Sequence, residues 1–231
     1  EKKRITTETQ IQKKSTGIRG RTPWLDVDFL IFSLLCFVFS MCFFQLMNTL
    51  PLYYKEVYQL KDWDIGFLLA SNGIIVFALE MIIVSLMERL LTTRRILVIG
   101  MLLCSLSFIT LLPVHHLSIL YLSMFFLSLS EIFAMPFMAT VAIQCASSGR
   151  EGAYMGINSL SFSAAFIFSP IAGTAIASRY GYNTLWEITA LVALVTAIGF
   201  GWIMKRIERR RKGIGEESES VEEPLIQATR L

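Results

Sequence analysis

Long apolar runs alternate with short polar segments along this chain. Six such runs lie between Phe29 and Met204, and most are close to the roughly 20 residues that an α-helix needs to cross a bilayer. None shows the alternation with period two that marks a half-buried β-strand. The pattern predicts an all-α, polytopic membrane protein with six transmembrane helices, at Phe29–Leu50, Ile65–Met87, Ile96–Leu112, Leu117–Cys145, Ala153–Ala177 and Thr184–Met204.

Prolines and charges mark where these runs end. Pro51 and Pro113 directly follow the first and third runs, and we expect them to close those helices because proline does not continue a helix. The flanking segments are polar. The chain therefore divides into a cytoplasmic linker (1–28), a six-helix bundle (29–204) and a disordered cytoplasmic tail (205–231), which is acidic from residue 213 onward.

Composition and charge support this class and orient it. With 54% hydrophobic and 17% charged residues, the chain is too apolar for a single soluble domain. Residues 1–21 hold seven Lys and Arg and residues 205–212 hold six, whereas the predicted outer loops hold only Lys55, Lys61 and Arg179. The positive-inside rule places both termini in the cytoplasm. The net charge of +3 then reflects topology, and we expect no nucleic-acid partner.

Motifs of several other classes are missing. The sequence has neither H-E-x-x-H nor G-x-S-x-G, so we expect no enzyme, and no TVGYG-like filter indicates a channel. The four cysteines all fall in predicted spans and form no C-x-x-C, so we expect no bound metal and no cofactor. A membrane protein with a purely structural or assembly role remains an alternative.

Two glutamates interrupt the apolar runs. Glu80 and Glu131 lie about 22 Å inward from the outer ends of their spans, at 1.5 Å per residue. A carboxylate at such depth is unfavourable by roughly 2.5–3.5 kcal/mol and usually binds, pairs or moves a proton. Burial favours the protonated form of a carboxylate, so both are candidates for proton coupling. The alternatives are a permanently protonated glutamate in an interhelical hydrogen bond, or an ion pair with a base outside this chain.

Further side chains are candidates for other roles in the spans. Pro136 and Pro170 each remove a backbone donor inside a span, which makes them hinge candidates or simple kinks. Polar residues in the spans suit either a substrate cavity or helix–helix hydrogen bonds, and Phe162 is a candidate for an apolar part of that cavity. The substrate-cavity candidates are Gln45, Asn48, Asn72, Asn158 and Phe162.

Two segments resemble a known family of transporters. The segment YMGINSLSFSAAFIFSPIAGTAIASRYGYNTLWEITALVALV is similar to the eleventh and twelfth helices of the major facilitator superfamily, and LPLYYKEVYQLKDWDIGFLLASNGIIVFALE resembles the end of its seventh helix and its eighth. The resemblance implies the C-terminal six-helix half, helices 7 to 12, of a twelve-helix transporter. It further implies two inverted three-helix repeats, with the first, second, fourth and fifth spans lining a cavity and the third and sixth facing lipid.

The loop between the second and third spans matches a family motif only in part. That motif often reads G-x-L-x-D-R-x-G-R-R, and the segment here is VSLMERLLTTRRIL. Its charged residues are candidates for a gating role, with a topology anchor as the alternative, since the glycines are missing and the spacing is longer. These residues are Glu88, Arg89, Arg94 and Arg95.

The resemblance implies a secondary active transporter that moves a small solute by alternating access. Glu80 and Glu131 favour proton coupling, as symporter or antiporter, and the many phenylalanines favour efflux of a drug or lipophilic solute. A uniporter or sugar-type symporter of the same fold is the alternative. The expected partners are membrane lipid, protons, the solute and an N-terminal six-helix half, in the plasma membrane or in the inner membrane of a bacterium.

Overall fold

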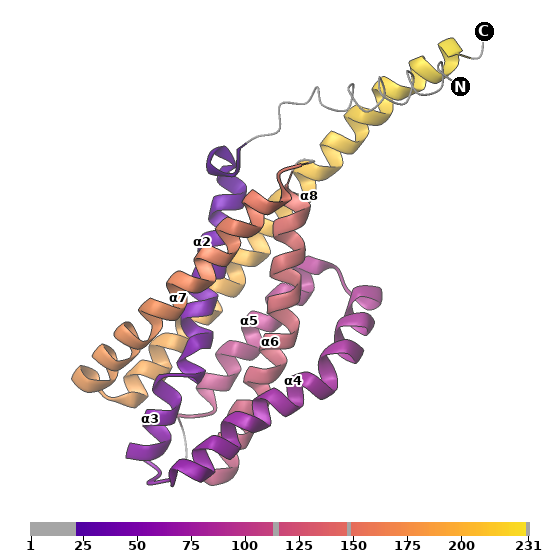
Figure 1. Ribbon diagram of the computed structural model, residues 1–231. Helices are drawn as coiled ribbons and strands as arrows, with labels where there is room; N and C mark the ends of the chain where they lie inside the picture. The colour runs from indigo at the N-terminus through magenta and orange to yellow at the C-terminus, as the bar shows by residue number, and fades with distance from the viewer. Residues whose placement is uncertain (1–21, 113–115, 147–148, 230–231) are drawn as a thin grey trace.

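The computed structural model of this chain describes residues 22–112, 116–146 and 149–229, with side chains as far as Arg210. The described residues form helices joined by short turns and contain no β-strand, which confirms the predicted all-α class. Figure 1 shows a bundle of long helices from which α8 extends at one end. The elements are η2 (Pro23–Leu25), α2 (Val27–Phe43), η3 (Phe44–Leu46), α3 (Thr49–Glu56), α4 (Asp62–Leu90), α5 (Thr93–Ile109), α6 (Leu117–Cys145), α7 (Glu151–Tyr180) and α8 (Tyr182–Thr229).

The helices follow the apolar runs closely. The bounds of α6 are those predicted, and α4 and α7 extend a few residues beyond their predicted ends. Helix α8 continues past Met204, where the sixth predicted span ends, to Thr229. Five segments of the described chain are long and apolar enough to cross a membrane, whereas α5, with 17 residues, is shorter.

The first predicted span differs most from its prediction. It is broken at Phe44–Asn48, where a 3₁₀ turn and a bend separate α2 from α3. Pro51 does not end this span, and that prediction was wrong. It lies in the first turn of α3, where its missing N–H would have no helical partner in any case. Pro113, the other expected terminator, lies outside the described residues.

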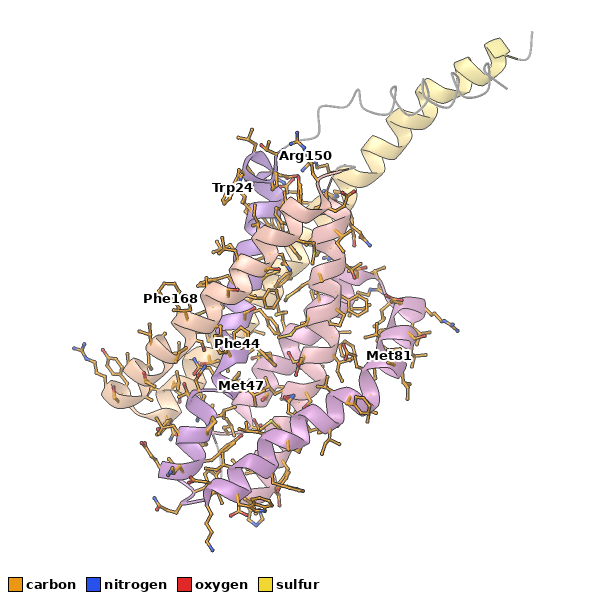
Figure 2. All side chains as sticks on the ribbon, viewed as in Figure 1. Trp24, Phe44, Met47, Met81, Arg150 and Phe168 are labelled. Carbon is orange, nitrogen blue, oxygen red and sulfur yellow. The ribbon has the colours of Figure 1, made fainter. Side chains whose placement is uncertain are left out.

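Packing groups the helices unequally. Helix α5 packs against α6 and α8, α2 packs against α7 and α8, and α4 packs against α6. Gly100 permits the close approach of α5 to α6, because a Cβ there would lie 3.1 Å from that of Phe133. Only 11% of the apolar part of α4 and 17% of that of α7 is buried, compared with 44% in α6 and α8. Figure 2 shows Met81 of α4 and Phe168 of α7 on opposite sides of the bundle. These two helices therefore offer the largest free surfaces.

Candidate functional site

Glu131 and Asn72 meet at the contact between α4 and α6. The amide Nδ2 of Asn72 donates to Oε2 of Glu131 at 2.9 Å. Asn72 is buried and Glu131 is half-buried, so neither polar group faces the outside of the bundle freely. A polar side chain inside a membrane protein is energetically unfavourable unless it forms a hydrogen bond or an ion pair. The structure thus joins two of the predicted site residues directly.

Glu80 lies further along α4 than its sequence depth suggested. Glu131 contacts α4 at Asn72. Glu80 is eight residues beyond Asn72 on the same helix, a distance of about 12 Å along its axis. Figure 1 shows the reason, because α4 crosses α6 obliquely. Glu80 is half-buried on the same helix as Asn72. We refer to Asn72, Glu131 and Glu80 together as the α4–α6 cluster.

A second polar group lies at the break between α2 and α3. Gln45 and Thr49 are both buried, and Oε1 of Gln45 and Oγ1 of Thr49 have no hydrogen-bond partner. Both side chains lie against Gly173 of α7, where an added Cβ would collide with those same oxygen atoms. Four residues earlier on α7, Oγ of Ser169 donates to the carbonyl of Met41 at 3.0 Å. Small residues on α7 therefore let it approach the broken helix closely.

The remaining cavity candidates have less in common. Asn48 is half-buried, and its amide donates to the carbonyl of Phe44 at 3.0 Å. This hydrogen bond stabilises the turn between α2 and α3 and contacts no other helix. Figure 2 shows Phe44 and Met47 at this break. Asn158 of α7 is buried with no partner for its Oδ1, and Phe162, one turn further on, is half-buried.

The charged loop candidates do not pair with one another. Glu88 and Arg89 end α4, while Arg94 and Arg95 lie in the first turn of α5. Among the described residues, none of these four side chains takes part in an ion pair. Glu88, Arg89 and Arg95 are exposed. A gating role for this loop therefore stays a prediction.

Both hinge candidates lie inside helices and share one local feature. Pro136 is within α6 and Pro170 within α7. The hydroxyl of the threonine four residues later donates to each proline carbonyl, from Thr140 at 2.9 Å and from Thr174 at 2.6 Å. Such back-bonding tends to bend a helix, and it adds to the donor that each proline removes.

A charged cluster that the sequence motifs did not predict lies at the other end of α2. Asp26 Oδ1 lies 2.7 Å from Nη1 of Arg210, and Asp28 Oδ1 lies 2.6 Å from Nε of Arg206. The hydroxyl of Tyr154 donates to Oδ2 of Asp26 at 3.3 Å. Asp26 also caps α2, accepting from the N–H of Phe29. This terminal cluster links α2, α7 and α8, and both aspartates are buried.

A signal for this cluster was present in the chain. Asp26 and Asp28 are acidic residues at the edge of a span, next to a segment that is otherwise strongly basic. A carboxylate buried at such a place requires a cationic partner. Only the folded arrangement identifies that partner, because the basic segment after Met204 offers several arginines.

Comparisons with known proteins agree with this architecture. Residues 32–231 match the Major Facilitator Superfamily. A crystal structure of a point variant of the peptide transporter POT superposes with a TM-score of 0.69 at 18% identity, covering 89% of this chain and 45% of that protein. The same variant in complex with sulfate superposes with a TM-score of 0.66 at 17% identity, covering 93% and 47%. No curated protein matches this sequence significantly.

The chain belongs to the Major Facilitator Superfamily, since the match covers most of its length. It is a multi-pass integral membrane protein, and the described residues include five segments long and apolar enough to cross a membrane. The likeness to POT, at under 20% identity, concerns the fold alone. The chain spans less than half of the length of the POT structures that it matches.

Proposed function

We propose that this chain forms one half of a secondary active transporter that moves a small solute by alternating access, with proton coupling at the α4–α6 cluster. The observation that carries the proposal is the hydrogen bond between Asn72 and Glu131. It joins a titratable group to a neutral donor inside the membrane, between two helices. A carboxylate held in this way can bind a proton in one state of the helix pair and release it in another.

The position of α4 supports this mechanism. Its apolar part is the least buried of the spanning helices, so it has room to move relative to α6. Glu80 lies on the same helix, nearer the end that the Lys and Arg distribution assigns to the cytoplasm. Glu80 therefore offers a second carboxylate to which a proton from Glu131 could pass on its way to the cytoplasm. In this proposal Pro136, one turn beyond Glu131, allows α6 to bend as the site changes its exposure.

The solute is proposed to contact the break in the first span together with α7. Gln45 and Thr49 bring buried polar atoms without partners to the break, and Asn158 and Phe162 are further candidates along α7. An amphipathic or lipophilic solute suits this mixture better than a sugar, which needs many hydrogen bonds. The opposite wall of the cavity comes from an N-terminal six-helix half.

The test uses the full-length protein in proteoliposomes with an imposed pH gradient. Uptake of glucose, of the dipeptide dialanine and of the lipophilic cation ethidium is measured first, and a transported solute is then used for the variants. In Glu131→Gln we expect gradient-driven accumulation to be lost while exchange at equal pH persists, because glutamine keeps the shape and the hydrogen bonding but binds no proton. Glu187→Gln, an exposed glutamate on α8, is the matched control.

Glu80→Gln separates the two carboxylates. A loss equal to that of Glu131→Gln indicates a shared proton, and a mild effect indicates a structural role for Glu80. Normal gradient-driven accumulation in both single variants and in the double variant would rule out this site as the coupling element. Transport would then use another ion, or would proceed by facilitated diffusion.

A further inference from the structure

An open, apolar hollow of about 530 Å³ lies between η2 and the beginning of α7. Pro23 and Trp24 form one wall. Trp24 is 67% exposed, a common state for a tryptophan at the membrane boundary. Figure 2 shows Trp24 and Arg150 at the same end of the bundle. The proton and solute residues described above do not line this hollow.

The other wall is a single stripe along α7. It consists of Ala153, Gly156, Ile157 and Leu160, spaced as neighbours on one face of a helix. Gly156 keeps the stripe hollow, because a Cβ built there would have no atom within 4 Å. The hollow is therefore a groove that begins at the N-terminus of α7 and follows the helix into the apolar part of the bundle.

Arg150 lies at the mouth of this groove as the N-cap of α7. Its guanidinium forms no ion pair with any described residue. The neighbouring carboxylate of Glu151 instead accepts from the backbone N–H of Gly149 at 3.2 Å. By the Lys and Arg distribution, this end faces the cytoplasm. The groove thus combines an unpaired cation and an aromatic ring at the membrane boundary with an apolar channel below them.

We propose that this groove binds one anionic phospholipid of the cytoplasmic leaflet. The phosphate pairs with Arg150, the ring of Trp24 lies at the level of the headgroup, and an acyl chain follows the stripe from Ala153 to Leu160. Tryptophan is enriched at this level of membrane proteins, and basic residues near the cytoplasmic surface attract anionic lipids. The proposal is independent of proton coupling.

Two other occupants of the groove are conceivable, namely the N-terminal segment of this chain and a second half of the transporter, and their charge fits less well. Residues 1–21 carry seven Lys and Arg with only two Glu, so this segment would repel Arg150 rather than pair with it. The cytoplasmic ends of a second half would also be rich in Lys and Arg by the positive-inside rule. An anionic headgroup is the better complement.

Native mass spectrometry of the full-length protein tests the site by titration with dioleoyl phosphatidylglycerol and dioleoyl phosphatidylcholine. In Arg150→Gln we expect phosphatidylglycerol affinity to fall roughly fivefold, the factor for one basic residue near an anionic surface, and phosphatidylcholine binding to stay unchanged. Gly156→Leu, which fills the groove, should lower the affinity for both lipids. Arg179→Gln, an exposed arginine at the opposite end of α7, is the control and should change neither. Soluble glycerol phosphate should not compete, because it lacks the chain.

Unchanged phosphatidylglycerol binding in both Arg150→Gln and Gly156→Leu would overturn the proposal. Competition by soluble glycerol phosphate would also overturn it, by showing an anion site without a lipid groove. A drop in thermal stability of Gly156→Leu with full lipid binding would show that a segment of protein covers the groove instead.

Discussion

Asp26 and Arg210 lie 184 positions apart in the chain, and their side chains form an ion pair of 2.7 Å. The pair joins the N-cap of α2 to the part of α8 that follows the sixth apolar run. Its aspartate side chain is 4% exposed and its arginine side chain 33% exposed. It is therefore neither a free surface pair nor a fully buried one, and Tyr154 adds a third helix to it.

Removal of Arg210 should destabilise the bundle. In Arg210→Gln a buried carboxylate loses its cation, and we expect about 1–3 kcal/mol of lost stability, below the 3–5 kcal/mol of a fully buried pair because the arginine is partly solvated. Thermal unfolding of the purified protein in detergent measures this. Arg209→Gln, an exposed neighbour, should have little effect.

A double variant checks the origin of that loss. Asp26→Asn with Arg210→Gln leaves no buried charge unpaired, so its loss should be smaller than the sum of the two single losses. Strictly additive losses would show that the ion pair itself contributes nothing.

Gly173→Ala should disturb the contact between α7 and the broken first span. The new methyl group would collide with the side-chain oxygens of Gln45 and Thr49, and overpacking of this kind destabilises by about 1–3 kcal/mol. Gly152→Ala on the same helix is the control, because it meets no atom within 4 Å and should be neutral or slightly stabilising. Equal melting temperatures for the two variants would contradict the tight contact.

Asn72→Leu should impair proton-driven uptake more than it impairs folding. Glu131 would lose the donor at 2.9 Å, and we expect gradient-driven uptake to fall at least tenfold while the melting temperature changes little. The matched amide is Asn48, whose Nδ2 donates only to a carbonyl of its own segment, so Asn48→Ala should keep most of the uptake. Normal uptake by Asn72→Leu would separate Asn72 from the coupling step.

Reporter fusions should place the two ends of the bundle on opposite sides of the membrane. A reporter at Leu231 is expected in the cytoplasm and one at Lys61, in the turn before α4, outside, because the Lys and Arg distribution orients the helices. Alkaline phosphatase and a fluorescent protein read out the two sides. The same side for both fusions would contradict the predicted topology.

Much of the helical layout could be predicted from the chain alone. The apolar run that became α6 has the same bounds in the structure as in the sequence, because nothing but turn residues flanks it. The first span could not be predicted as well. Its apolar run is continuous, but the helix breaks where Gln45 and Thr49 pack against Gly173, a contact between residues far apart in the chain.

Sequence by itself determined which segments are apolar enough to enter the membrane and indicated the family, since hydropathy acts locally on each segment. It also predicts an orientation from the distribution of the basic residues. The tertiary structure alone decided which residues meet. The sequence placed Glu80 and Glu131 at equal depth, yet Glu131 bonds Asn72, because the oblique crossing of α4 and α6 sets the register. The arginine partners of Asp26 and Asp28 likewise depend on how α8 packs beside α2, which no local pattern encodes.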